Sequence, residues 1–336
     1  MKAAVFLRKG KMEIQEREIP TPASGEVLVK VKACGICGTD QHIFHGHPGS
    51  TDVVTPIVLG HELSGEVVAI GDHVEFLKLG DRVTIDPNIY CGTCEYCRQG
   101  RRHLCDHLEA IGVTRDGGMA EYVTVPAKNC YLLPDSLTYE EGALVEPLGC
   151  VIHGIEQVKI WPGASVCIIG GGFIGQIMLQ LVKMYGASPV IVSEPDESKY
   201  QTLLDFQADL VINPLKKDLK QTIAGGVDIV IECAGRQETM EQAVALAKKG
   251  GQILLFGVSS PHDKIQVSPY EVFSKELVIR GSFINPNTHP MAISLIEKGK
   301  VSVRPLISHC FTLNEIPDIM PKYKELKVAK GILRFE

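Results

Sequence analysis

Four cysteines lie close together in the chain, and their spacing suits a single metal ion. They are Cys91, Cys94, Cys97 and Cys105. Soft sulfur ligands on one loop can close around a tetrahedral Zn²⁺, and a shell of four thiolates leaves no position open for a substrate. We therefore expect a structural zinc that stabilises an irregular lobe at about residues 91–105. The alternative is that these are four unrelated buried cysteines.

A second set of possible metal ligands is dispersed along the chain. It consists of Cys37, His61, Glu62 and Glu146. A catalytic zinc typically combines sulfur, nitrogen and oxygen ligands from distant segments and keeps one position open for the substrate. Spacing alone does not bring these residues together. Taken singly, His61 also suits a structural histidine, and Glu146 suits a carboxylate at the start of a helix.

A glycine-rich turn follows the apolar run SVCIIG and opens an amphipathic helix at residues 173–185. The turn consists of Gly170, Gly171, Gly172, Phe173, Ile174 and Gly175. This G-x-G-x-x-G pattern allows a tight turn and lets the backbone approach a pyrophosphate closely. The next run ends about 20 residues later in Glu194, whose carboxylate would accept the adenosine ribose hydroxyls and repel a 2′-phosphate. NAD is therefore favoured over NADP. Lys199 is either a second ribose contact or an ordinary surface lysine.

The secondary-structure elements expected to position these groups differ between the two halves of the chain. Up to about residue 150, short β-branched runs bounded by Gly, Pro or Asp indicate a compact, barrel-like antiparallel domain. From about residue 163, six buried runs with helical segments between several of them predict a doubly wound parallel sheet. A helical segment at residues 139–160 bridges the two parts. Further helices are expected at residues 291–297 and 313–326.

Length and composition narrow the class of protein. The 336 residues suit two domains, and a formal net charge of -6 argues against a nucleic-acid-binding surface. The amino terminus lacks a secretory signal pattern, and no apolar stretch reaches the roughly 20 residues that span a bilayer. A cytoplasmic protein with reduced cysteines and no membrane partner is expected.

Together these motifs resemble the zinc-dependent medium-chain alcohol dehydrogenases, and within them the polyol (sorbitol) dehydrogenase branch. The residues Gly60-His61-Glu62-x2-Gly65-x5-Gly71-x2-Val74 match the zinc alcohol dehydrogenase signature. The cysteine lobe and the glycine-rich turn follow in the expected order. Glu146-Pro147-Leu148 is typical of the polyol branch, because the long-known alcohol dehydrogenases have Cys there.

The resemblance implies an α/β fold with a GroES-like β-barrel catalytic domain at 1–150 and a Rossmann domain at 151–285. A carboxyl-terminal segment, 286–336, would return to the catalytic domain. The resemblance assigns the catalytic zinc to Cys37, His61 and Glu146, with Glu62 beside it as a neighbouring or exchanging ligand. Asp40 would orient His61 through a hydrogen bond.

The resemblance also implies a reaction, in which a secondary hydroxyl loses its proton near the zinc and hydride passes to NAD. Thr39 and His42 would relay the proton to solvent. Gly257 and Val258 close another strand end near the cofactor. The branch usually has Arg-Tyr where this chain has Ile284-Asn285, so the expected small-molecule substrate is a different polyol or a sugar acid.

Two other interpretations stay open. A simple-alcohol or amino-alcohol dehydrogenase of the L-threonine type is the nearer one, and a non-catalytic NAD-binding structural protein is the more distant one. Relatives of this kind are usually homodimers or homotetramers. The apolar run LVIRGSF at the sheet edge is a plausible surface for self-association.

Overall fold

The computed structural model describes residues 1–336, which divide into two compact units. The first unit combines Met1–Gly149 with Ile284–Glu336, and the second is Cys150–Phe283. None of the helices is both long and apolar enough to span a bilayer.

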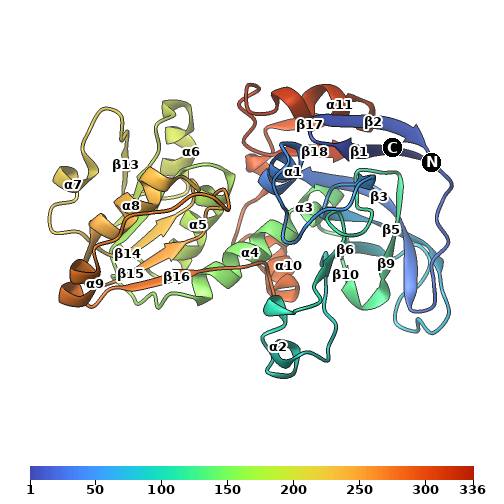
Figure 1. The fold of residues 1–336 in the computed structure, drawn as a ribbon, viewed down its shortest axis with the longest axis horizontal. Helices are drawn as coiled ribbons and strands as arrows, with labels where there is room; N and C mark the ends of the chain where they lie inside the picture. Colours follow the sequence, from blue (N-terminus) through green and yellow to red (C-terminus); the bar gives the residue numbers. More distant parts are fainter. The chain divides into compact units, whose positions relative to one another are not determined.

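The first unit is built on antiparallel strands (Figure 1). Its strands are β1 (Lys2–Arg8), β2 (Lys11–Glu16), β3 (Glu26–Ile36), β4 (Ile57–Val58), β5 (Glu62–Ile70), β6 (Arg82–Ile85), β7 (Asn88–Ile89), β8 (Glu109–Ala110), β9 (Tyr122–Pro126), β10 (Cys130–Leu132), β17 (His309–Phe311) and β18 (Gly331–Arg334). Seven of them form one sheet in the order β10-β6-β5-β3-β18-β17, with β9 also paired to β3. Alternate residues of β3, such as Val27, Val29 and Val31, are fully buried in the core.

Short helices connect and cover these strands. They are α1 (Gly38–Phe44), α2 (Glu95–Arg98), η1 (Arg102–Leu104), η2 (Ala127–Asn129), α3 (Tyr139–Ala143), α10 (His289–Glu297), η4 (Arg304–Leu306), η5 (Leu313–Glu315), α11 (Ile316–Ile319) and η6 (Met320–Lys322). The continuous helix expected at 313–326 is wrong. Pro317 and Pro321 lack the backbone N–H that a helix interior needs, so the segment breaks into three short turns.

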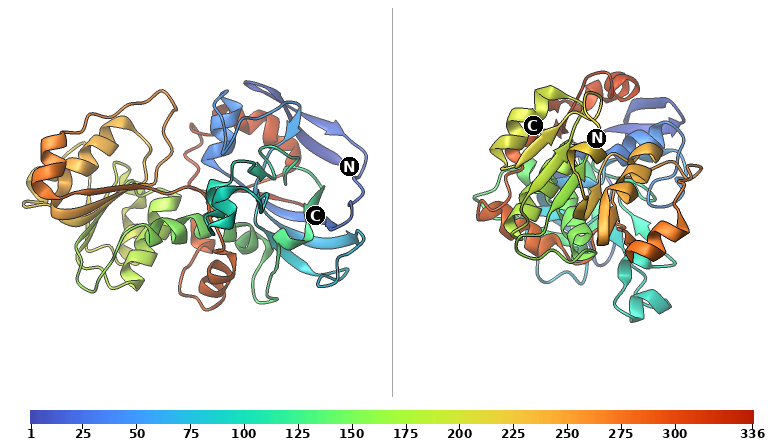
Figure 2. Two further views of the ribbon diagram at one scale, coloured as in Figure 1. Left: turned by 60° about the horizontal axis from the view of Figure 1, so that its bottom comes forward. Right: turned by 90° about the vertical axis from the view of Figure 1, so that its left-hand side faces the viewer.

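The carboxyl-terminal segment belongs to the first unit because its last strand joins the main sheet. β18 pairs antiparallel with β3, with Gly331 opposite Ile36 and Leu333 opposite Cys34. Figure 2 shows this segment in red beside the blue amino-terminal strands. This pairing brings residue 330 next to the end of β3.

The second unit is a parallel sheet in the order β13-β12-β11-β14-β15-β16. Its strands are β11 (Val166–Ile169), β12 (Val190–Ser193), β13 (Leu210–Ile212), β14 (Val227–Glu232), β15 (Ala247–Leu255) and β16 (Val278–Gly281). Its helices are α5 (Phe173–Met184), η3 (Glu197–Lys199), α6 (Tyr200–Asp205), α7 (Leu219–Thr222), α8 (Gln237–Leu246) and α9 (Pro269–Lys275). The six predicted runs are these six strands, and the order is that of a doubly wound sheet. The predicted two-part α/β fold class is confirmed.

The bridging segment is not one helix, as the sequence suggested. It divides into α3 and α4 (Val145–Glu156), with Leu144 between them. The Thr138 hydroxyl caps α3 by accepting from the Glu141 N–H, and the Glu141 carboxylate accepts a hydrogen bond from the Thr138 N–H. The break places Glu146 in the first turn of a new helix.

Candidate metal centres and dinucleotide site

The four-cysteine lobe has the geometry of a closed metal site. Cys91, Cys94, Cys97 and Cys105 offer sulfur atoms that all lie within 4.8 Å of one another. Two of the sulfur pairs, Cys91 with Cys97 and Cys94 with Cys105, are each 4.0 Å apart. A tetrahedron of Zn–S bonds of about 2.3 Å has edges of about 3.8 Å, so the four thiols fit a structural zinc site.

Backbone N–H groups donate hydrogen bonds to two of these sulfurs, those of Cys91 and Cys105. The N–H groups of Thr93 and Cys94 donate to Cys91 Sγ at 3.4 and 3.3 Å, and lower the pKa of that thiol to about 5. The N–H groups of Cys91 and His107 donate in the same way to Cys105 Sγ. Since zinc binds the thiolate, these donors favour the form of the side chain that ligates.

The end of β3 and the start of β5 bring together the dispersed candidates. Cys37 follows β3 as the N-cap of α1, while Glu62 begins β5 and His61 directly precedes it. One ligand atom from each of these three side chains lies within 4.8 Å of the others. A thiol, an imidazole and a carboxylate form a donor set that suits a zinc ion with one open position.

Asp40 connects the parts of this site. It is fully buried in the first turn of α1 and accepts hydrogen bonds from the N–H groups of Cys37 at 2.8 Å and Gly60 at 3.3 Å. Its Oδ1 lies 3.7 Å from His61 Nδ1. Burial opposes the charged imidazole, but Cys37 and Asp40 outweigh it and raise the pKa of His61 well above its usual value. The separation of 3.7 Å is too long for a hydrogen bond, and His61 Nδ1 has no hydrogen-bond partner, so the expected Asp40–His61 hydrogen bond is absent and Asp40 acts on His61 through its charge.

Glu146 lies outside the compact group of three. It is 6% exposed, and its Oε1 accepts a hydrogen bond from Asn285 Nδ2 at 3.2 Å. Its charge is close enough to contribute to the raised pKa of His61. The structure thus brings the carboxylate of Glu62, rather than that of Glu146, within reach of both Cys37 and His61.

Lys330, which the sequence did not single out, is paired with Glu62. Its ammonium group forms an ion pair with Glu62 Oε2 and donates to the Ile36 carbonyl at 3.2 Å. Burial opposes its charge, but Glu62 and Cys37 raise its pKa above the usual lysine value. Gly35 makes the arrangement possible, because a Cβ at that position would lie 2.0 Å from Glu62 Oε2. In the sequence Lys330 is one of several lysines near the carboxyl terminus, and only its burial distinguishes it.

Replacing Lys330 tests how strongly this pair supports the fold. Lys330→Met leaves the carboxylate of Glu62 buried without its partner, so we expect zinc-free protein to lose about 3–5 kcal/mol of unfolding free energy. Denaturant unfolding measures the loss. The exposed pair of Lys216 with Glu197 supplies the control, because Lys216→Met should cause no measurable change. A Lys330→Met variant as stable as the Lys216 control would contradict this assignment.

The candidate proton relay lies on α1. Thr39 and His42 are three residues apart and therefore share a face of the helix. Both are partly buried. Burial, followed by the neighbouring His47 and Lys324, lowers the pKa of His42. A neutral imidazole at this position can accept a proton.

The glycine-rich turn of the second unit forms a close cradle between β11 and α5. Gly170 has a φ of +101°, and a Cβ on Gly175 would lie 1.9 Å from the Gly170 carbonyl oxygen. Gly172 is the N-cap of α5, and a Cβ there would meet nothing within 4 Å. Phe173 and Ile174 then begin the helix. Backbone N–H groups at this open helix start suit a pyrophosphate.

Glu194 lies at the end of β12 and supports that turn directly. Its Oε2 accepts from the Gly171 N–H at 2.9 Å, and its Oε1 accepts from the Asp196 N–H at 2.8 Å. Lys199 Nζ lies 3.1 Å from Oε1. The carboxylate is only 3% exposed, so it already shapes the turn without a ligand.

Another strand end carries Gly257 and Val258. A Cβ on Gly257 would lie 2.3 Å from the Gly235 N, whereas Val258 is 67% exposed. Glu232, which the sequence did not single out, is fully buried and accepts from the N–H groups of Ala234 and Gly235. It fixes the turn against which Gly257 packs.

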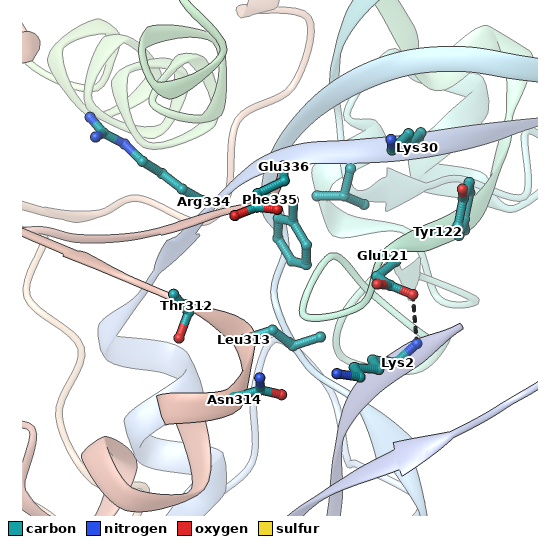
Figure 3. Close-up of a pocket in the computed structure, with 11 residues that line it drawn as sticks. Lys2, Lys30, Glu121, Tyr122, Thr312, Leu313, Asn314, Arg334, Phe335 and Glu336 are labelled. Atoms are coloured by element: carbon teal, nitrogen blue, oxygen red, sulfur yellow. Dashed lines mark hydrogen bonds between the residues drawn. The ribbon is translucent and has the colours of Figure 1, made fainter.

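A separate hollow on the first unit contains none of the candidate residues. It lies beside β1, β3, β9 and β18, and Figure 3 shows Lys2, Lys30 and Arg334 there together with Glu121. The main-chain N–H of Lys2 donates to Glu121 Oε2 at 2.7 Å. With both signs of charge and no cysteine or histidine in its lining, this hollow is distinct from the site described above.

Comparison with known proteins gives one consistent family. The model of the alcohol dehydrogenase GroES-like domain matches residues 23–135, and that of the zinc-binding dehydrogenase matches residues 174–298. Sorbitol dehydrogenase from Gallus gallus is 36% identical over 99% of this chain and 96% of its own length.

Solved structures that resemble this chain belong to the same family. A zinc-binding dehydrogenase from Sinorhizobium meliloti 1021 bound to NADP is 39% identical, with a TM-score of 0.95 over 99% of both chains. An alcohol dehydrogenase (rspB) from E. coli CFT073 complexed with NADH is 32% identical, with a TM-score of 0.93 over 100% of this chain and 99% of the other. The chain therefore belongs to the zinc-dependent medium-chain alcohol dehydrogenases, in the branch that resembles the polyol dehydrogenases.

Proposed function

We propose that this enzyme oxidises a secondary hydroxyl of a polyol or sugar acid to a ketone and transfers the hydride to NAD. The observation that carries the proposal is the group of Cys37, His61 and Glu62, whose ligand atoms lie within 4.8 Å of one another. The likeness to sorbitol dehydrogenase supports the polyol class of substrate.

The residues divide the chemical work. Cys37 and His61, with a carboxylate from Glu62 or Glu146, would hold a zinc ion, and the four cysteines at 91–105 would hold the structural one. A bound zinc supplies positive charge that favours ionisation of an alcohol, and NAD supplies the hydride acceptor. The charge of Asp40 lies 3.7 Å from the imidazole of His61. Thr39 passes the alcohol proton toward His42, whose lowered pKa leaves it neutral and ready to accept.

The carboxylate of Glu194 supports NAD as the preferred cofactor. It lies at the strand end where the adenosine ribose binds in such folds, and its charge opposes a 2′-phosphate. Lys199 offsets part of that charge, and among the related structures one is bound to NADP and another to NADH.

Glu194→Gln keeps the shape of this side chain and removes its charge. We expect NAD binding to weaken about tenfold, since hydrogen bonds to a charged group are worth roughly 1.5–3 kcal/mol, whereas NADP binding should hold or improve. Fluorescence titration with both cofactors measures this. The exposed Glu197→Gln, on the following turn, is the control. Equal weakening for NAD and NADP would show that Glu194 only supports the turn.

Self-association belongs to the same proposal. β16 is the edge strand of the parallel sheet, and each of its residues is exposed. An exposed edge with unpaired backbone groups favours pairing with a second copy, which supports a homodimer or a homotetramer.

The experiment that tests the function is NADH formation by zinc-loaded protein. The panel comprises hexitols, pentitols, aldonates, L-threonine and short alcohols, followed by near-ultraviolet absorbance. Turnover confined to a polyol or an aldonate supports the proposal. Turnover confined to L-threonine or short alcohols assigns the enzyme to that substrate class instead.

A further inference from the structure

We infer that Asn285 is a positioning residue that fixes the carboxylate of Glu146, and that its own orientation is dictated from Asp86 through Asn88. This inference rests on the proposed zinc-dependent oxidation. It concerns a position where the chain departs from the polyol dehydrogenase pattern, since the branch usually has tyrosine there.

The chain of hydrogen bonds runs through three buried side chains of the first unit. Asp86, Asn88 and Asn285 are 5%, 3% and 0% exposed. Asn88 Nδ2 donates to Asp86 Oδ1 at 3.0 Å and to Asn285 Oδ1 at 2.6 Å. Asn285 Nδ2 then donates to Glu146 Oε1 at 3.2 Å and to the Glu146 carbonyl at 3.4 Å.

The chemistry of these groups allows only one direction for the chain. Asp86 Oδ1 accepts a hydrogen bond from the main-chain N–H of Asn88 at 3.0 Å, so this oxygen is an acceptor and the Asn88 side chain turns its NH₂ group toward it. The same NH₂ group faces Asn285, which must therefore accept the hydrogen bond with its side-chain carbonyl oxygen. The NH₂ group of Asn285 is thereby left pointing at Glu146. An amide that could otherwise flip is held with its donors on the carboxylate.

The backbone around Asn285 is shaped for this contact. Ile284 and Asn287 have φ values of +48° and +59°, a region that a β-branched residue such as Ile284 rarely adopts. Thr288 Oγ1 donates to the Asn285 carbonyl at 3.0 Å. Gly149 in α4 permits the close approach, because a Cβ there would lie 2.6 Å from Thr288 Oγ1. Strained backbone of this kind persists where the surrounding contacts over-determine it.

The consequence for the site is geometric. Glu146 lies in the first turn of α4, and Asn285 restrains both its carbonyl and its Oε1. Partners of this kind around metal ligands typically alter metal affinity or activity by 10–100-fold when they are removed. Asn285 would act through Glu146 without touching substrate or cofactor.

The isosteric variant N285D is the sharpest test, because it exchanges the donor that faces Glu146 for an acceptor. We expect at least a tenfold fall in kcat with an unchanged KM for NAD. We also expect at least a tenfold weaker affinity for the more weakly held zinc ion, measured by chelator competition. The zinc of the four-cysteine lobe should stay bound and acts as an internal reference in every sample.

Asn129→Asp is the matched control. Asn129 is a buried asparagine of the same network, 5% exposed, but its Nδ2 donates only to the main-chain carbonyls of Asp86 and Asn88. It should lose stability without a selective change in zinc affinity. If N285D does not fold, Asn88→Ala removes the group that orients Asn285 and should weaken zinc in the same direction.

The outcomes separate this inference from the proposed function. If N285D binds zinc with the same affinity as the Asn129 control, the positioning role is overturned, whatever the activity. If N285D does not fold, the same comparison is made with Asn88→Ala. A wild-type enzyme that oxidises no alcohol overturns the proposed function, while the zinc titration still decides the role of Asn285.

Discussion

His61→Ala should abolish alcohol oxidation, with a loss of at least about a thousandfold, and should lower the zinc content from two ions per chain to one. The imidazole is the central member of the group formed with Cys37 and Glu62. A catalytic zinc needs about three protein ligands, and without His61 only two of the compact set are left. The positive charge that favours ionisation of the alcohol is worth several kcal/mol, and each 1.36 kcal/mol corresponds to a tenfold change in rate.

This prediction is tested by two measurements, NADH formation and metal content per chain. His153→Ala is a suitable control, because His153 is another buried histidine, 6% exposed, that lies in the second unit. The control should keep both zinc ions. A His61→Ala variant that keeps two zinc ions and full turnover would contradict the assignment of this group as the catalytic centre.

The parallel sheet could be predicted from the sequence because its central strands have a recognisable local pattern. Parallel strands covered on both faces are continuous apolar runs, and Val166–Ile169 and Val190–Ser193 are buried at every position. The glycine-rich turn is a local motif for the same reason, since its conformation depends on neighbouring residues. The four-cysteine lobe is local as well, with all its ligands inside one loop.

What the sequence could not predict depends on contacts between distant segments. Lys330 meets Glu62 only because β18 pairs with β3, and no local pattern marks that lysine. Asn285 meets Asn88 across 197 positions of the chain. The compact set of Cys37, His61 and Glu62 follows from the β3–β5 pairing, in which Gly35 lies opposite Glu62. The continuous helix expected at 313–326 is also wrong, because Pro317 and Pro321 interrupt it.

Cys97→Ser should release the structural zinc and destabilise the first unit. The lobe has only α2, of four residues, and the three-residue turn η1 as regular structure. Since so short a segment buries little apolar surface, its order depends on the metal, and structural zinc contributes about 10–16 kcal/mol in small zinc-binding peptides. If only about 4 kcal/mol of this is lost, the melting temperature should fall by about 10 °C.

Cys130→Ser is the control for Cys97→Ser, because it removes a buried thiol without removing a proposed zinc ligand. Comparing the two variants shows whether the order of the lobe depends on its metal. Cys130 is buried in the same unit but lies outside the group of four sulfur atoms, so its replacement should remove no zinc ligand. Metal analysis and thermal melts should therefore show two zinc ions and a near-native melting temperature for Cys130→Ser, but one zinc ion and a large decrease for Cys97→Ser. Equal melting temperatures in the two variants would mean that the lobe folds without its metal.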